Sequence, residues 1–356
     1  MLRAVDELDS KATLSDLLRQ SSLTGGADVL SVARRQVGAG QVASCWHLEL
    51  VVDGLDAPIE VVVKMPSSDP VSLATARAQH LYEREVRFYE LIAPIVVIRT
   101  PACFASAFDE ATGGFLLVLE SLLPAATCDQ LDGLALELAT IAVTELAGLH
   151  APLWDVPSPP GLAFVDDVAD SLRPLYQEVL PALFVGFLDR YGDQVAAPTR
   201  AVVEWLMPRL GTYLSGRGGP PTVIHGDFRT DNLIFGGRCG EVPMATVDWQ
   251  TVAHGSGALD VAYLLTTSLE PEVRRAHELE LLDVYLDRLC TLGVTGYDRR
   301  ALFDDYAWHA FQGIVMLVCA SMLVVRTERG DAMFLTMIER SAAAVEDLDA
   351  RSRLAT

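Results

Sequence analysis

Two polar residues five positions apart, enclosed by short apolar runs, constrain this chain more than any other feature. Asp227 and Asn232 lie within VIHGDFRTDNLIF, between two predicted short strands, and Asp248 ends the next predicted strand, Ala245–Trp249. This order predicts two carboxylates and one amide at one end of a hairpin. Asp and Asn also favour ordinary turns, but turn formation alone does not account for all three residues at these offsets.

A set of oxygen ligands of this kind suits phosphoryl transfer. Hard oxygen ligands hold the metal ions that bridge phosphate oxygens. A separate carboxylate accepts or orients the proton of the attacking hydroxyl. The spacing also follows the kinase catalytic loop, H-x-D-x-x-x-x-N, with a metal-binding Asp on the following strand.

These residues resemble the aminoglycoside phosphotransferase and choline kinase group, which writes the loop as HGD-x-x-x-x-N. The segment VYLDRLCTLGV favours its ecdysteroid-kinase-like branch. The resemblance covers most of the chain from about Gly38. It implies an α+β, bilobal, protein-kinase-like fold with a small β-rich N-lobe and a larger, mainly helical C-lobe. It also implies Asp227 as the catalytic base, Asn232 and Asp248 as magnesium ligands, and His225 as a support for the loop.

The order of predicted elements agrees with two lobes. A helical segment, Ala4–Gln20, precedes a strand-rich region, a helix over Val71–Ile92 and a hairpin around Asp109–Gly114. Long helices follow, with one short hairpin among them. We expect residues 1–121 to form the N-lobe and residues 122–356 the C-lobe, with a ligand site in the cleft between them.

Within the C-lobe, apolar periodicity predicts a long helix over Leu131–His150. The stretch Asp166–Leu214 is mostly helical in pattern. We expect Pro174, Pro181 and Pro198 to interrupt it, because proline removes a backbone donor and disfavours a helix interior.

A lysine ends the valine-rich run IEVVVKMP, and a buried cation there needs a partner. In the kinase pattern such a lysine contacts the α- and β-phosphates of ATP and pairs with a helix glutamate. We therefore assign Lys64 to nucleotide binding. Glu83, Glu85 and Glu90 are possible partners, and we select Glu85 because the family places this glutamate just before an aromatic pair, as in EVRFY.

Two further segments complete the expected nucleotide site. In VGAGQVASCW, Gly38 and Gly40 permit a close approach of backbone to phosphate, and Ser44 can add a hydroxyl. The segment FLLVLESLLP resembles the linker between lobes, so we expect Glu120 and Leu122 to line the adenine. Taken singly, these segments also fit an ordinary turn and an ordinary edge strand.

Four other residues have less specific interpretations. His150 resembles a family position, and we interpret it as a structural core residue. Asp260 matches a family aspartate that positions the catalytic loop, although a carboxylate at a helix start looks the same. Arg229 lies inside the catalytic loop and contacts either phosphate or solvent, and the role of His254 is open.

The net charge, the cysteines and the N-terminal sequence indicate which partners and which compartment to expect. A formal net charge of −21 argues against nucleic acid and anionic membranes as partners. The six cysteines are scattered, which fits a reducing compartment. The N-terminus lacks the apolar core of a signal peptide, and the apolar run Gly313–Val325 suits a buried helix. We therefore expect a cytoplasmic monomer or homodimer.

The prediction is an enzyme that uses ATP and Mg²⁺ to phosphorylate a hydroxyl of a small molecule. A non-catalytic nucleotide-binding module is the first alternative, although none of the chemical residues is missing. A protein kinase is the second, and the absence of Asp-Phe-Gly and Ala-Pro-Glu segments argues against it.

Overall fold

The computed structural model describes residues 5–19, 21, 23–38, 42–126, 128–157, 160–215 and 219–354. Gly40 lies outside the described residues. The chain divides into two compact units. The N-terminal unit comprises Met1–Pro94 and Thr100–Pro124, and the C-terminal unit comprises Ile95–Arg99 and Ala125–Thr356.

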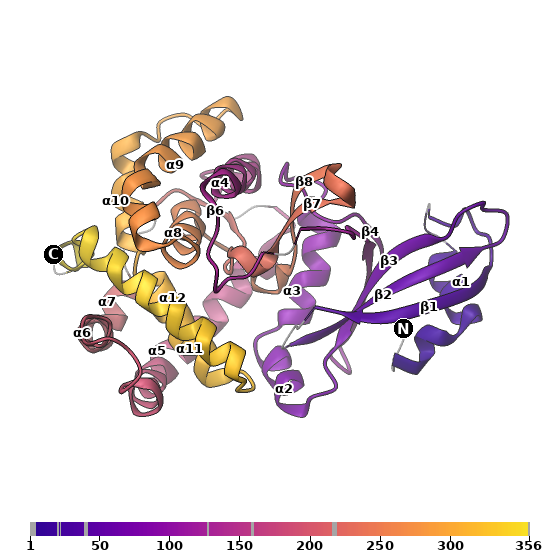
Figure 1. Ribbon diagram of the computed structural model, residues 1–356, viewed down its shortest axis with the longest axis horizontal. Coiled ribbons are helices and arrows are strands. Elements are labelled where there is room, and N and C mark those ends of the chain that lie inside the picture. Colours follow the sequence, from indigo (N-terminus) through magenta and orange to yellow (C-terminus); the bar gives the residue numbers. More distant parts are fainter. Residues whose placement is uncertain are drawn as a thin grey trace. The chain divides into compact units, whose positions relative to one another are not determined.

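The N-terminal unit is built on a five-stranded antiparallel sheet with strand order β1-β2-β3-β5-β4 (Figure 1). The predicted Asp53–Gly54 turn lies between β2 and β3. The strands are β1 (Val29–Val37), β2 (Ala43–Val52), β3 (Ile59–Pro66), β4 (Cys103–Asp109) and β5 (Gly114–Glu120).

The single helix predicted over Val71–Ile92 is wrong in detail. The structure has α2 (Pro70–Ala78), α3 (Leu81–Arg87) and one π-helical turn, Phe88–Ile92. The break lies at His80, whose φ of 55° is left-handed and ends the regular helix. As a result, α3 can take a direction different from that of α2.

The N-terminal segment belongs to the core of its unit. A 3₁₀ turn, Val5–Asp9, leads into α1 (Lys11–Leu18), where one continuous helix was predicted. The side chain of Ser10 separates them by accepting the N–H of Thr13. Leucines of this segment then join the apolar side chains of the sheet in one buried cluster: Leu8, Leu14, Leu18, Val29, Leu48, Leu50, Val52, Val61, Val63, Met65, Leu116 and Val118.

The C-terminal unit is mainly helical and is centred on α8 (Gly257–Ser268), in which every residue except Leu259 is buried (Figure 1). The other helices are α4 (Leu136–His150), α5 (Ala163–Tyr191), α6 (Ala197–Leu206), α7 (Leu210–Leu214), α9 (Pro271–Thr291), α10 (Arg299–His309), α11 (Gln312–Leu323), α12 (Glu328–Asp347) and α13 (Ala350–Leu354).

Two predictions about these helices are wrong. Helix α4 begins at Leu136 and not at Leu131. Helix α5 continues through Pro174 and Pro181, which were expected to interrupt it. Each proline removes one backbone hydrogen bond, but buried apolar side chains such as Leu180 and Phe184 hold the helix against the core. Pro198 is the second residue of α6, and in this first turn its missing N–H costs nothing.

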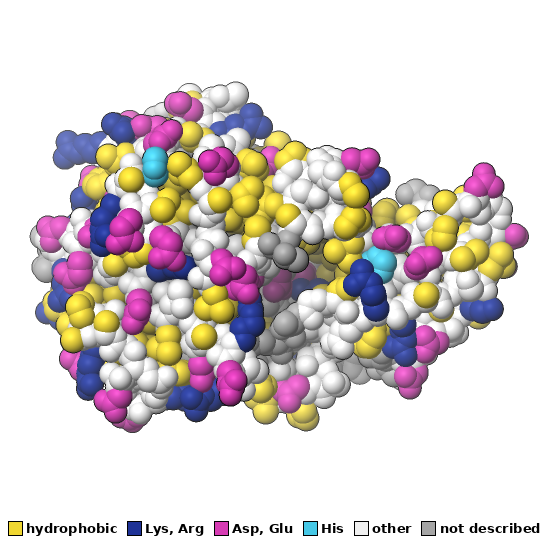
Figure 2. Space-filling view, in the orientation of Figure 1, with side chains coloured by type: hydrophobic (Ala, Val, Ile, Leu, Met, Phe, Trp, Pro, Cys, Tyr) yellow, Lys and Arg dark blue, Asp and Glu magenta, His cyan; other side chains and the backbone are white. Residues whose placement is uncertain are grey.

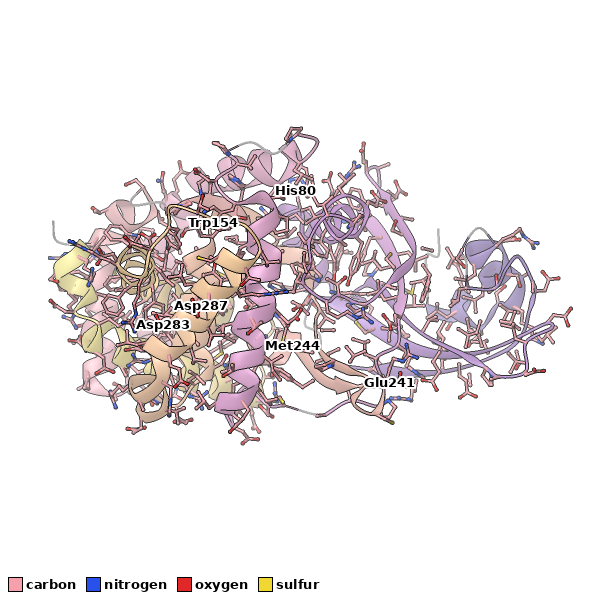
Figure 3. The ribbon with its side chains drawn as sticks, turned by 90° about the horizontal axis from the view of Figure 1, so that it is seen from above. His80, Trp154, Glu241, Met244, Asp283 and Asp287 are labelled. Carbon is pink, nitrogen blue, oxygen red and sulfur yellow. The ribbon has the colours of Figure 1, made fainter. Side chains whose placement is uncertain are left out.

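Two small antiparallel sheets lie within the C-terminal unit. Strand β7 (Leu233–Gly237) pairs with β8 (Val242–Thr246), as the hairpin prediction required. In that hairpin Glu241 is exposed at the tip and Met244 is buried (Figure 3). Strand β6 (Pro221–Ile224) pairs with β9 (Ala253–Ser256), which the sequence did not predict. The loop that carries Asp227 therefore connects two separate sheets.

Charged side chains of both signs are interspersed on the face that Figure 2 draws. Figure 2 shows Asp and Glu side chains scattered over the visible face, with Lys and Arg between them. On α9, for example, Asp287 is exposed on the outward side (Figure 3), whereas Tyr285 is fully buried. One helical stretch among the described residues, Arg299–Leu323, is long and apolar enough to cross a membrane, and 67% of its most apolar window is buried inside the protein. Core helices pass the same test.

Candidate functional site

The side chains of Asp227 and Asn232 contact each other, as the loop motif requires. The Asn232 amide nitrogen donates to an Asp227 carboxylate oxygen at 3.0 Å and to the Asp227 carbonyl at 2.8 Å. The backbone of Asn232 in turn accepts the N–H of Val247 at 3.0 Å. Since Val247 directly precedes Asp248, the Asp227 carboxylate, the Asn232 amide and the Asp248 carboxylate are assembled at one end of the β7–β8 hairpin.

A buried carboxylate on α8 holds the start of this loop. Asp260 accepts the backbone N–H of His225 at 2.6 Å and that of Gly226 at 2.9 Å. Gly226 has a φ of +82°, and a Cβ at this position would lie 2.6 Å from the carbonyl oxygen of Thr251. Only glycine therefore fits between the histidine and the aspartate of the HGD motif.

Two further buried residues extend this contact to α4 and α9, and the sequence did not identify either as part of the site. His150 lies 3.4 Å from Asp260 through Nε2, and its Nδ1 lies 2.7 Å from the hydroxyl of Tyr285. Because the Asp260 carboxylate can only accept, Nε2 carries the proton and Nδ1 accepts from Tyr285. His150 was interpreted as a core residue, and the structure adds its link to the loop.

His225 is placed to support the loop from within. Its Nδ1 accepts the N–H of Asp227 at 3.2 Å, and its Nε2 lies 3.0 Å from the carbonyl of Val247. With Nδ1 accepting, Nε2 is the protonated nitrogen and donates. The ring also packs against Trp249 at a centroid distance of 4.6 Å. One side chain thus fixes the backbone beside both Asp227 and Asp248.

The Asp227 carboxylate has two more polar neighbours. Arg229 Nε lies 3.3 Å from it, and Arg229 Nη1 donates to Asp231 at 2.8 Å. Burial alone would lower the pKa of Arg229, but the charges of Asp227 and Asp231 raise it, so the guanidinium remains a cation. The Tyr263 hydroxyl also bonds to Asp227; burial, together with that charge, raises the pKa of Tyr263 and keeps it a donor.

The residues assigned to magnesium have the chemistry that this ion prefers. The amide nitrogen of Asn232 is committed to Asp227, which leaves its carbonyl oxygen as the available ligand atom. Asp248 follows β8 with a left-handed φ of 66° and accepts from Gln250 at 3.2 Å. In the described parts of the chain no group of three or more His, Cys, Asp or Glu forms a metal cluster. Magnesium needs none, because it uses one or two protein oxygens plus substrate phosphates.

In the N-terminal unit, Lys64 and Glu85 form the predicted pair. The Lys64 nitrogen lies 2.7 Å from both carboxylate oxygens of Glu85, and these residues are 7% and 1% exposed. The other candidates contact different residues: Glu83 lies near His80 and Arg87, and Glu90 accepts from Ser106. The structure therefore selects Glu85 as the partner of Lys64.

The remaining predicted residues occupy the ends of the N-terminal strands. Gly38 follows β1 with a φ of +71° and has open space around it. Ser44 pairs with Met65 across β2 and β3, one residue beyond Lys64. At the end of β5, Glu120 accepts the N–H of Ala102 at 3.0 Å. Leu122 is buried just beyond it, at 3% exposure.

Comparison with known proteins supports this description. Residues 50–303 match the model of a family described as the phosphotransferase enzyme family. Among solved structures, the chain is similar to a microcompartment-associated aminopropanol kinase, with 14% identity and a TM-score of 0.54 over 96% of this chain and 98% of that chain.

Two other solved structures show the same likeness. A Plasmodium vivax ethanolamine kinase has 11% identity and a TM-score of 0.53, with 90% of this chain and 83% of that chain covered. The GDP complex of aminoglycoside 2'-phosphotransferase-IIIa has 14% identity and a TM-score of 0.50, with 94% of this chain and 99% of that chain covered. At such low identity the likeness concerns the fold, and it confirms the predicted protein-kinase-like class.

Proposed function

The chain belongs to the phosphotransferase enzyme family, and from that premise we propose that it transfers the γ-phosphoryl group of ATP to a hydroxyl of a small molecule. The observation that carries this proposal is the contact of Asp227 with Asn232 beside Asp248, because that set combines a base with two oxygen ligands for magnesium. The solved structures similar to this chain include kinases of amino alcohols, which supports a small acceptor.

In this mechanism Asp227 accepts the proton of the acceptor hydroxyl as that oxygen attacks the γ-phosphorus. Asn232 fixes the carboxylate through its amide nitrogen at 3.0 Å, so the base keeps one orientation. The base contributes roughly 10²–10⁴-fold to the rate. Positioning of the two substrates provides most of the remaining acceleration.

The anionic nucleotide needs positive charge in a protein whose net charge is −21. Lys64, held by Glu85, contacts the α- and β-phosphates in this proposal. Asn232 and Asp248 would hold magnesium, which would supply neutralising charge for the phosphates. In the same proposal Glu120 and Leu122 line the adenine, and Gly38 and Ser44 lie at the phosphates.

The competing function is nucleotide binding without transfer. None of Asp227, Asn232 and Asp248 is replaced, and all three lie at the same hairpin end, which favours catalysis over that alternative. A partly buried arginine, Arg229, also lies beside the proposed base, where a transferred phosphoryl group needs charge stabilisation.

The experiment is a thermal-shift titration with ATP, with and without Mg²⁺, on the wild type and on Asp248→Ala. Ligand binding to the native state raises the melting temperature. We expect a magnesium-dependent rise for the wild type that Asp248→Ala loses, and Asp283→Ala, an α9 surface change, serves as control. ATP consumption in the presence of amino alcohols, sugars and sterols then tests transfer. A wild type with no shift for any nucleotide would refute the proposal.

A further inference from the structure

The hydroxyl of Tyr82 joins the ends of two strands that carry proposed phosphate ligands. It lies 2.5 Å from the carbonyl oxygen of Val42, just before β2, and accepts the backbone N–H of Ser67, just after β3, at 3.3 Å. Ser44 is two residues from the first contact and Lys64 three residues from the second. The hydroxyl therefore ties both strands at the end where these side chains lie.

The ring of Tyr82 is itself fixed. It is 2% exposed and stacks on Phe115 of β5, with centroids 4.3 Å apart and planes inclined by 20°. Burial raises the pKa of the Tyr82 phenol, so the hydroxyl keeps its proton and donates it to Val42. A fixed ring and a defined donor give the contact a single geometry.

Tyr82 and Glu85 lie three positions apart on α3 and hence on one face of it. Glu85 fixes the side chain of Lys64, and Tyr82 fixes the backbone on either side of the β2–β3 pair. Helix α3 therefore fastens this pair of strands by two separate contacts.

We infer that Tyr82 is a positioning residue for the nucleotide phosphates, which sets the backbone at Val42 and Ser67 and so fixes the end of the β2–β3 pair from which Lys64 meets the phosphates. The inference rests on the proposed function. The inference goes beyond the proposed function because it gives Tyr82, which lies outside the proposed ligand set, a part in the affinity for phosphate groups.

The test is Tyr82→Phe, which keeps the ring on Phe115 and removes only the hydroxyl. Isothermal titration calorimetry measures the Kd of ATP with Mg²⁺ and the Kd of adenosine, which has no phosphates. Loss of two hydrogen bonds at the strand ends is expected to weaken ATP binding by about tenfold. Adenosine binding is expected to remain within twofold of wild type.

The matched control is Tyr213→Phe, which removes a buried hydroxyl that donates to Gln312 at 3.1 Å in the C-terminal unit. It should change neither Kd. Hydrogen–deuterium exchange of the peptide containing Ser67 provides a second measurement and should be faster in Tyr82→Phe without nucleotide.

The outcomes separate the inference from the proposed function. If the wild type binds ATP and the Tyr82→Phe protein binds ATP equally well, the inference alone is overturned. Equal weakening of ATP binding and of adenosine binding also overturns the inference, because Tyr82 then acts on the whole N-terminal unit. A wild type that binds neither ligand overturns the proposed function and the inference with it.

Discussion

The buried carboxylate of Asp260 accepts the backbone N–H of His225 at 2.6 Å, so a charge on α8 sets the start of the loop that carries Asp227. Asp260→Asn keeps one acceptor oxygen but turns an amide toward the second N–H. We expect this change to lower stability by about 1–3 kcal/mol and also to lower turnover. Urea unfolding and steady-state kinetics measure the two effects. Unchanged turnover would mean that the loop holds its shape without Asp260.

Asp227→Asn tests the base directly. The amide keeps the shape of the carboxylate but accepts no proton, so turnover should fall by roughly 10²–10⁴-fold. The melting-temperature rise with MgADP should persist, because Asn232 and Asp248 are intact. The control is Asp287→Asn, an exposed residue on α9. Full turnover in Asp227→Asn would remove Asp227 from the mechanism.

Lys64→Met leaves Glu85 buried without its cation, and this should cost about 3–5 kcal/mol of stability. The double variant Lys64→Met with Glu85→Leu replaces the ion pair by apolar groups and should recover most of that loss. Neither protein should bind ATP at the wild-type affinity. Recovery of both stability and ATP affinity in the double variant would contradict the role proposed for Lys64.

Leu14→Ala tests whether α1 is part of the N-terminal core. Leu14 is 1% exposed and belongs to the buried cluster of the sheet. Its truncation should destabilise the protein by about 2–5 kcal/mol. Lys11→Ala, an exposed change in the same helix, should have little effect. Denaturant unfolding distinguishes the two, and equal stabilities would show that α1 contributes little to the unit.

Cysteine labelling tests burial as a function of pH. Burial raises the pKa of Cys103 and of Cys319 to about 12, whereas Cys239 and Cys290 are exposed. The thiolate is the reactive form, so at pH 8 Cys239 and Cys290 should react with iodoacetamide first. Raising the pH raises the thiolate fractions of the partly buried Cys103 and Cys319, and this should narrow the difference in labelling rate between them and the two exposed cysteines. Mass spectrometry of peptides measures each site, and rapid labelling of Cys319 at pH 8 would contradict its burial.

The motif residues could be found from the sequence because their spacing is local. Asp227 and Asn232 lie on one loop, and a run of valines marks the strand that carries Lys64. The fold class followed from these motifs and is confirmed, and so is the family group. The ecdysteroid-kinase-like branch, the cytoplasmic location and the oligomeric state stay predictions, as do the roles of individual site residues.

Local patterns failed where long-range contacts outweigh propensity. Pro174 and Pro181 predicted breaks that the packing of α5 overrides. The break at His80 has no Gly or Pro to mark it, and it depends on how α2 and α3 each pack. Strand β9 is four residues long and forms only because β6 pairs with it.

By itself the sequence determined which groups we predict to carry the chemistry, because Asp227, Asn232, Asp248 and Lys64 are defined by residue type and by spacing along the chain. Only the tertiary structure decided what holds them in place. Asp260 lies 35 positions from His225, and Tyr285 lies 135 positions from His150. Such contacts have no period or spacing in the sequence, since they depend on which faces of α4, α8 and α9 are buried together.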